Sequence, residues 1–178
     1  YTTFSYIIVF LLMTQTLRRR EQLDRLLTTI VLTSVPIALY GLLQHYEMDP
    51  LPWGGDVSFR VAANMGNAIF IGAYLILVAP ITLVQVLREA GKAWAEFPQR
   101  LRLPLGLFFG VVWAAQSVAW AVLRFERGLI TSILMLVMLA LAAAWQRKPL
   151  ARFLLAGAYS VALTLQLVCI FFTHSRGP

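Results

Sequence analysis

Residues 67–87 read NAIFIGAYLILVAPITLVQVL, a run of 21 residues that contains no charged side chain. The hydrocarbon core of a bilayer is about 30 Å thick, and an α-helix of roughly 20 apolar residues spans it. Within that core every backbone N–H and C=O group must find a partner inside the protein, which a helix provides. Residues 67–87 therefore predict a membrane-spanning helix.

Five further apolar runs lie along the chain and are joined by short polar segments. They occupy residues 1–17, 26–44, 103–123, 129–145 and 153–173. Of the 178 residues, 60% are hydrophobic and 13% are charged, and the mean hydropathy is +0.74, well above that of a soluble domain. We predict an all-α, polytopic bundle of about six transmembrane helices, with residues 1–178 in one domain. Because Tyr1 lies inside an apolar run, we expect a fragment of a longer chain.

The distribution of Lys and Arg predicts an orientation in the membrane. The first, third and fifth connections carry 11 of the 15 basic residues. The opposite side carries the other four, which are Arg60, Arg124, Arg127 and Arg176. Basic connections usually face the cytoplasm, so we expect loop 45–66, the turn at 124–128 and the C-terminal end outside. The positive charge then reflects topology, and we expect no nucleic-acid partner.

The predicted spans lack the groups that several membrane functions require. The five complete spans contain no Asp, Glu, Lys, Arg or His, which argues against ion-coupled transport through them. Haem binding normally needs a histidine within a span, whereas His45 and His174 lie at span ends. The single cysteine, Cys169, allows neither an internal disulfide nor a cysteine metal site. We therefore expect no metal and no cofactor.

Polar and aromatic side chains share one face of the fourth predicted span. At helical spacing this face holds Trp113, Gln116, Ser117 and Trp120. One interpretation is a contact between helices, with Gln116 and Ser117 forming hydrogen bonds across it. The other is a groove for a lipid or isoprenoid chain, lined by the two indole rings.

Two arginines on the predicted outer side lie beside short polar motifs. Arg60 precedes VAANMGN at 61–67, and Arg176 lies within THSRG at 173–177. A guanidinium offers paired donors in one plane and stays charged, which suits a pyrophosphate. Asn67, at the start of a span, is expected to cap that helix and leave free amides for an anion. The alternative is that these arginines extend to lipid headgroups.

Five short motifs lie on or near the predicted outer side. They are YGLLQ at 40–44, DPLPW at 49–53, Arg60 followed by MGN at 65–67, FIGAYL at 70–75, and THSRG at 173–177. Together they resemble the N-terminal half of the O-antigen ligase family, which includes lipopolysaccharide ligases, O-antigen polymerases and bacterial protein O-oligosaccharyltransferases. Ala68 stands where that family often has a proline after its Gly-Asn pair.

This resemblance implies a metal-independent glycosyltransferase in the bacterial plasma (inner) membrane. Such an enzyme moves a glycan from undecaprenyl pyrophosphate to an acceptor on the outer face. Arg176 resembles the family arginine that engages the donor pyrophosphate, and Arg60 and Asn67 are implied to shape the same substrate-binding pocket. The proposed family base is a histidine in a large outer loop after the Ser-Arg-Gly span, which neither His45 nor His174 matches. We assign no catalytic residue and expect these 178 residues alone to be inactive.

Two other functions stay open on the sequence. The chain could be a non-catalytic accessory transmembrane subunit of a respiratory or photosynthetic complex, since its smooth apolar helices suit packing against other helices. It could also be half of a transporter or flippase. The expected partners are accordingly membrane lipids, a lipid-linked glycan donor or other transmembrane subunits.

A shared pyrophosphate site also predicts how the helices pack. Arg60 and Arg176 are more than a hundred residues apart in the sequence, yet both must reach one diphosphate. Spans 67–87 and 153–173 should therefore be neighbours, with loop 45–66 folded over the mouth of the last span.

Overall fold

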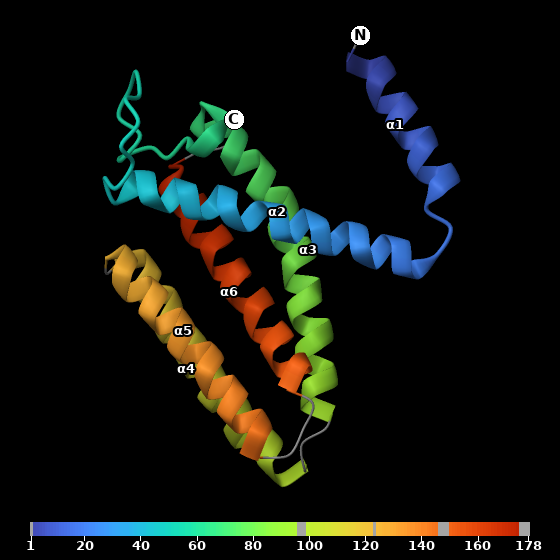
Figure 1. Cartoon of the computed structure of the whole chain (residues 1–178), viewed down its shortest axis with the longest axis vertical. Coiled ribbons are helices and arrows are strands. Elements are labelled where there is room, and N and C mark those ends of the chain that lie inside the picture. Colours follow the sequence, from blue (N-terminus) through green and yellow to red (C-terminus); the bar gives the residue numbers. More distant parts are fainter. Residues whose placement is uncertain (1, 96–98, 123, 146–149, 175–178) are drawn as a thin grey trace.

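The computed structural model describes residues 2–95, 99–122, 124–145 and 150–174. They form six α-helices: α1 (Thr2–Thr16), α2 (Arg20–His45), α3 (Ala68–Ala95), α4 (Gln99–Val122), α5 (Phe125–Trp145) and α6 (Leu150–Phe172) (Figure 1). A 3₁₀ turn, η1 (Ala63–Met65), precedes α3. The predicted all-α fold is confirmed, and each predicted span falls on one of these helices.

Among the residues that the structure describes, four helices are long and apolar enough to cross a membrane. They are α2, α3, α4 from Arg102 onward and α6 from Leu154 onward. α1 is apolar but has 15 residues, which gives a length of about 22 Å. Large apolar side chains on the long helices, such as Phe70 and Leu77, are exposed in the isolated chain because lipid is their solvent. The chain is thus a multi-pass membrane protein.

Several helices extend beyond the apolar runs that predicted them. α2 begins at Arg20 rather than at residue 26, and α3 continues to Ala95 rather than ending at residue 87. α4 and α5 also begin before their predicted starts at 103 and 129. Hydropathy marks the part of a helix within the hydrocarbon core, whereas backbone hydrogen bonds continue into the headgroup layer, where Arg and Lys reach water.

α2, α3 and α6 form the core of the bundle. α6 packs along α3, and α2 lies across both helices (Figure 1). Leu42, Ile71 and Cys169 are completely buried where the three helices meet. Gly41 permits this close approach, because a Cβ there would lie 2.7 Å from the Cys169 sulfur and 2.8 Å from Val61 Cγ1. The prediction that spans 67–87 and 153–173 are neighbours is confirmed.

The hairpin of α4 and α5 packs on α6 through polar side chains. Gln116 on α4 donates to Ser132 Oγ on α5 at 2.9 Å, and its Oε1 accepts from Thr164 on α6 at 3.3 Å. Trp120 is completely buried and donates from Nε1 to the same Ser132 Oγ at 2.9 Å. Ser132 thus accepts hydrogen bonds from both Gln116 and Trp120 and links α5 to α4.

Trp113 and Ser117, the other two residues of this polar face of α4, contact α6. Trp113 donates from Nε1 to the carbonyl of Ser160 at 3.3 Å, and the hydroxyls of Ser117 and Thr164 lie 3.2 Å apart. The contact between helices that was predicted for this face is confirmed, and the two indoles serve that contact rather than a lipid groove.

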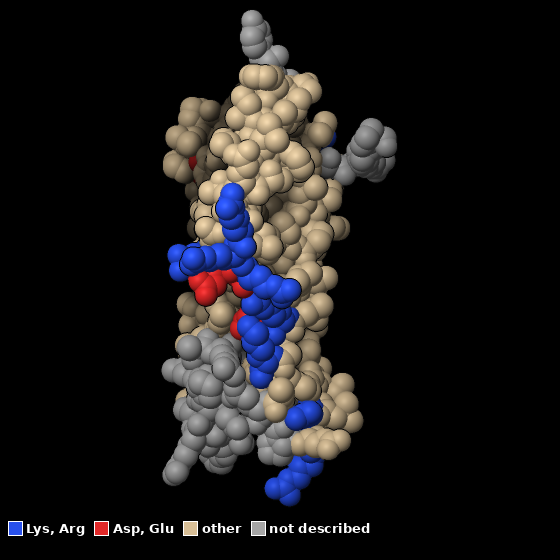
Figure 2. Space-filling view, turned by 90° about the vertical axis from the view of Figure 1, so that its right-hand side faces the viewer, with Lys and Arg blue, Asp and Glu red and all other residues tan. Residues whose placement is uncertain are grey.

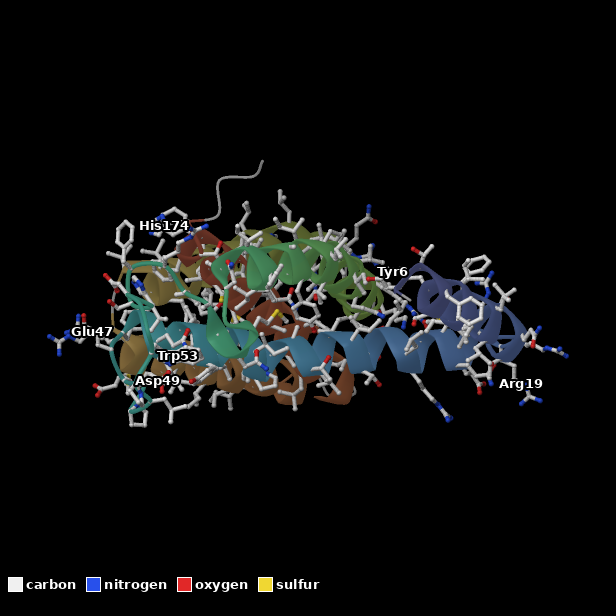
Figure 3. The ribbon with its side chains drawn as sticks, turned by 90° about the horizontal axis from the view of Figure 1, so that it is seen from above. Tyr6, Arg19, Glu47, Asp49, Trp53 and His174 are labelled. Carbon is white, nitrogen blue, oxygen red and sulfur yellow. The ribbon has the colours of Figure 1, made fainter. Side chains whose placement is uncertain are left out.

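The two ends of the bundle differ in character. We call the end that holds residues 46–67 and the C-terminus of α6 the loop end. The opposite end, which holds the α1–α2 connection and the last turns of α3, is the basic end. Figure 3 shows Asp49, Trp53 and His174 at the loop end and Arg19 at the opposite end. That the basic end faces the cytoplasm stays a prediction.

An ion pair joins α2 to α3 at the basic end. Arg88 donates to both carboxylate oxygens of Asp24, at 2.6 and 3.0 Å. This contact brings the first and third basic connections to one side of the bundle, as the alternation of spans requires.

Candidate functional site

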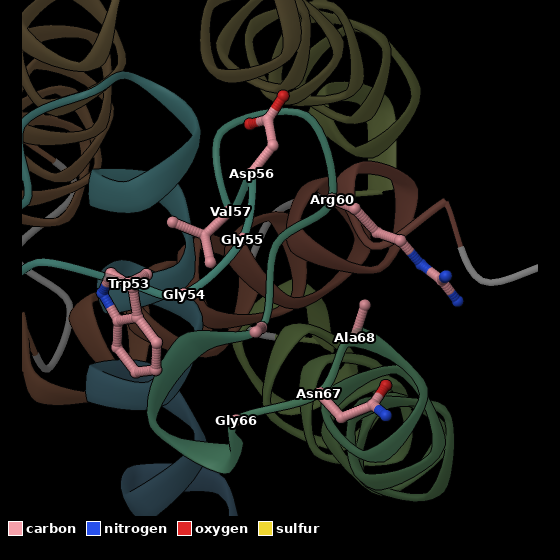
Figure 4. Close-up of a pocket in the computed structure, with 10 residues that line it drawn as sticks. Trp53, Gly54, Gly55, Asp56, Val57, Arg60, Gly66, Asn67 and Ala68 are labelled. Carbon is pink, nitrogen blue, oxygen red and sulfur yellow. The ribbon is translucent and has the colours of Figure 1, made fainter.

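An open pocket of about 330 Å³ lies at the loop end of the bundle. Arg60 and Asn67, two of the three predicted substrate-binding residues, line it together (Figure 4). Its other walls come from residues 53–57 and from the small residues on either side of η1. Arg176, the third predicted residue, lies outside the described part of the chain.

Arg60 is exposed and makes no ion pair with another described residue. Asp56 forms no ion pair with it, and Asp56 Oδ1 instead accepts hydrogen bonds from the Phe59 amide at 3.0 Å and the Ser58 hydroxyl at 2.7 Å. These bonds lower the pKa of Asp56. Figure 4 shows the Asp56 and Arg60 side chains directed away from each other. The guanidinium is therefore available to an external anion.

Asn67 caps α3, as predicted. Its Oδ1 accepts from the Ile69 amide at 2.9 Å, and its carbonyl oxygen accepts from the Phe70 amide at 3.1 Å. The turn before it needs Gly66, whose φ of 69° is in the left-handed region. No acceptor for the Ala68 amide lies among the described residues. The pocket therefore holds a helix N-terminus, which favours negative charge.

Gln44 fixes the segment between Arg60 and Asn67, and sequence reasoning gave it no role. It is buried, with 1% of its surface exposed. Its Oε1 accepts from the Ala63 amide at 2.7 Å and the Ala62 amide at 3.3 Å, and its Nε2 donates to the Ala63 carbonyl at 3.4 Å. Ala63 has a φ of 47°, a strained value for alanine. Gln44 holds the backbone in that conformation.

Asp49 organises the wall of the pocket that contains Trp53. Its Oδ2 accepts from the Trp53 indole at 2.8 Å and the Tyr40 hydroxyl at 2.7 Å, and its Oδ1 accepts from the Leu51 amide at 3.0 Å. Burial raises the pKa of Asp49, but these bonds and a longer one from Gln44 outweigh it, so the pKa is lowered. The ionised carboxylate is therefore the form that holds Trp53.

Acidification is expected to weaken the loop end through Asp49. Because the folded protein lowers its pKa, the stabilisation is present above the ordinary value of 3.8 and is lost as pH falls through the folded value. Thermal unfolding of the parent and of Asp49→Asn should be compared between about pH 6 and pH 2.5. The parent should unfold at higher temperature at pH 6, and the two curves should converge at low pH. Parallel curves would contradict this role.

The segment on either side of Arg60 is attached to the end of α6. The Val61 amide donates to the Phe172 carbonyl at 3.2 Å. The Phe59 ring stacks on the His174 ring, with centroids 5.0 Å apart and planes 13° apart. The predicted folding of loop 45–66 over the mouth of the last span is confirmed, and Phe172 and His174 lie against the residues on either side of Arg60.

The two histidines have structural contacts in this arrangement. His45 donates from Nδ1 to the Ser58 carbonyl at 2.8 Å and stacks on Phe172 with centroids 3.5 Å apart. Among the residues that the structure describes, no three His, Cys, Asp or Glu side chains gather where they could hold a metal ion. The site therefore consists of a cationic side chain, the Asp56 carboxylate, a helix N-terminus and an aromatic wall.

No family model matches the chain, and no curated protein or solved structure matches it either. The fold and the pocket define a class, which is a multi-pass helical membrane protein with an arginine-containing pocket at one end.

Proposed function

We propose that this chain is part of an integral-membrane glycosyltransferase of the O-antigen ligase type. In this proposal, the pocket at the loop end binds the pyrophosphate of an undecaprenyl pyrophosphate-linked glycan on the outer face of the bacterial plasma membrane. Arg60, Asn67 and Arg176 form the binding site. The resemblance of the five outer motifs to that family is the starting point.

One observation carries the proposal beyond that resemblance. Arg60 and Asn67, which the sequence motifs predict as substrate-binding residues, line a single pocket. Arg60 has no carboxylate partner among the described residues, and its neighbours Phe59 and Val61 contact the end of α6. A guanidinium beside a helix N-terminus suits a diphosphate at the membrane boundary.

Binding of undecaprenyl pyrophosphate to the chain in neutral detergent tests this function. Arg60→Ala should weaken binding about 10-fold to 100-fold, because a hydrogen-bonded charge pair contributes roughly 1.5–3 kcal/mol. Arg60→Lys should recover little, because an ammonium does not reproduce the planar pair of donors. Arg124→Ala is the matched control, since Arg124 is an exposed arginine at the same end of the bundle that does not line the pocket. Equal affinities for Arg60→Ala and the parent would refute the proposal and favour a headgroup role.

α1 favours a second candidate, the accessory subunit of a larger membrane complex. Every described side chain from Thr3 to Thr16 is exposed, and Figure 1 shows α1 apart from the other helices. Such a surface suits packing against helices of another protein. A photo-cross-linker at Phe10 should then capture a defined membrane protein in cells, whereas capture of lipid alone would count against this candidate.

A further inference from the structure

A surface of exposed basic side chains lies at the basic end, away from the pocket. We call it the basic patch, and it consists of Arg18, Arg19, Arg20, Arg25, Arg88 and Lys92. Figure 2 shows Lys and Arg gathered in a run on one face of the molecule, with few acidic side chains among them. The residues come from the α1–α2 connection, the first turns of α2 and the last turns of α3.

Internal ion pairs account for only two members of the patch. Arg88 is paired with Asp24, and Lys92 is paired with Glu89 at 2.6 Å. The other four arginines have no ion pair among the described residues, and the only acidic residue left near them is Glu21. The patch therefore keeps an excess of positive charge after its ion pairs with Asp24 and Glu89 are counted.

The position of these arginines around the start of α2 makes the excess of positive charge less favourable. They surround a helix N-terminus, where the macrodipole is already positive and further cations are unfavourable. Gln22 Oε1 accepts from the amides of Arg18 and Arg19, at 3.0 Å each. No acceptor for the amides of Arg20 and Glu21 lies among the described residues. An anion bound here would relieve the repulsion and accept these free N–H groups.

The location of the patch indicates which kind of anion it would meet. The patch arginines within residues 18–25 lie between the apolar α1 and the apolar part of α2, a position that corresponds to the headgroup layer when α2 spans a membrane. We propose that the basic patch binds the phosphate of an anionic phospholipid from the adjacent leaflet. A zwitterionic lipid offers the same phosphate but no net charge to offset the excess. This inference is independent of glycan transfer.

Native mass spectrometry of the chain in neutral detergent can test the proposal with defined lipids. The parent should bind palmitoyl-oleoyl phosphatidylglycerol much more tightly than the corresponding phosphatidylcholine. The triple variant Arg18→Gln/Arg19→Gln/Arg20→Gln should lose about 100-fold in affinity for phosphatidylglycerol, with phosphatidylcholine unaffected. The triple Arg→Lys variant should stay within a few-fold of the parent, because charge carries most of the attraction.

Two controls keep the result interpretable. Arg124→Gln/Arg127→Gln removes two exposed arginines from the opposite end and should bind phosphatidylglycerol as the parent does. Raising NaCl from about 0.1 M to 0.5 M should weaken phosphatidylglycerol binding by the parent itself, a readout that needs no variant. The proposal is overturned if the glutamine variant retains parental affinity, if salt has no effect, or if the parent does not distinguish the two lipids. In the last case an acidic protein would become the candidate partner.

Discussion

Replacing Arg176 by alanine in the full-length protein is expected to abolish glycan transfer, and replacing it by lysine is expected to restore little. Two charge-assisted contacts from one guanidinium to a pyrophosphate contribute about 3 kcal/mol or more, which corresponds to at least 100-fold. Lysine keeps the charge but presents a single ammonium group. Transfer should be measured with a labelled lipid-linked glycan in membranes that contain equal amounts of each variant.

The structure supplies the reason that Arg176 and Arg60 are expected to act on one donor. Residues 172 and 174 contact Val61 and Phe59, which flank Arg60 in the sequence. Arg176 follows His174 by only two residues, so the stretch of chain between them is short. Arg124→Ala is again the control and should transfer glycan normally. Normal transfer by Arg176→Ala would remove this residue from the donor site.

Gln44→Met is expected to lower the free energy of unfolding by about 3 kcal/mol. Methionine has nearly the same shape, so the packing against α3 and α6 is kept while the polar contacts are lost. The amides of Ala62 and Ala63 would then be buried without an acceptor, and each such group costs about 1–3 kcal/mol. Ala63 would also lose the support for its positive φ.

The matched control for this prediction is Gln15→Met. Gln15 lies on the exposed α1, and its side chain makes no hydrogen bond with the described residues. Unfolding should be followed by circular dichroism in mixed micelles of dodecyl maltoside and sodium dodecyl sulfate. A loss below about 0.5 kcal/mol for Gln44→Met would show that the loop is held by other contacts. Because Gln44 fixes the segment between Arg60 and Asn67, this variant should also bind the donor poorly.

The helices and the contact between α3 and α6 could be predicted from the sequence, whereas the rest of their lateral arrangement could not. Apolar runs located every helix because lipid imposes both composition and hydrogen bonding on a span. The same runs misplaced the start of α2 at residue 26, since the first turns of this helix are charged and lie in the headgroup layer. Gln116 was recognised as an interhelical polar residue, but its partners Ser132 and Thr164 depend on which helices pack together.

The pocket likewise contains residues that could be predicted from the sequence and one supporting residue that could not. Arg60 and Asn67 stand out because an outer-side arginine and a capping residue are visible as residue types. Gln44 was missed, since a glutamine at the end of an apolar run resembles an ordinary helix terminus. Its partners lie 18 and 19 residues further along the chain and become neighbours only when loop 45–66 folds back. The sequence feature that could have drawn attention to Gln44 was its position at the end of the YGLLQ motif.

Sided labelling of a single cysteine in the pocket tests the central claim most directly. Gly55 lines the pocket, and a Cβ there would meet nothing within 4 Å, so Gly55→Cys should be tolerated. Gln99→Cys, at the start of α4, is the control for the opposite side, and the native Cys169 is completely buried. A membrane-impermeant maleimide is applied to intact cells and then to the purified variant with undecaprenyl pyrophosphate present.

The account predicts that Gly55→Cys reacts from outside the cell, that Gln99→Cys reacts only after permeabilisation, and that undecaprenyl pyrophosphate slows the reaction of Gly55→Cys. A Gly55→Cys variant that is reached only from the cytoplasm, or that reacts at the same rate with and without undecaprenyl pyrophosphate, would contradict a donor site on the outer face.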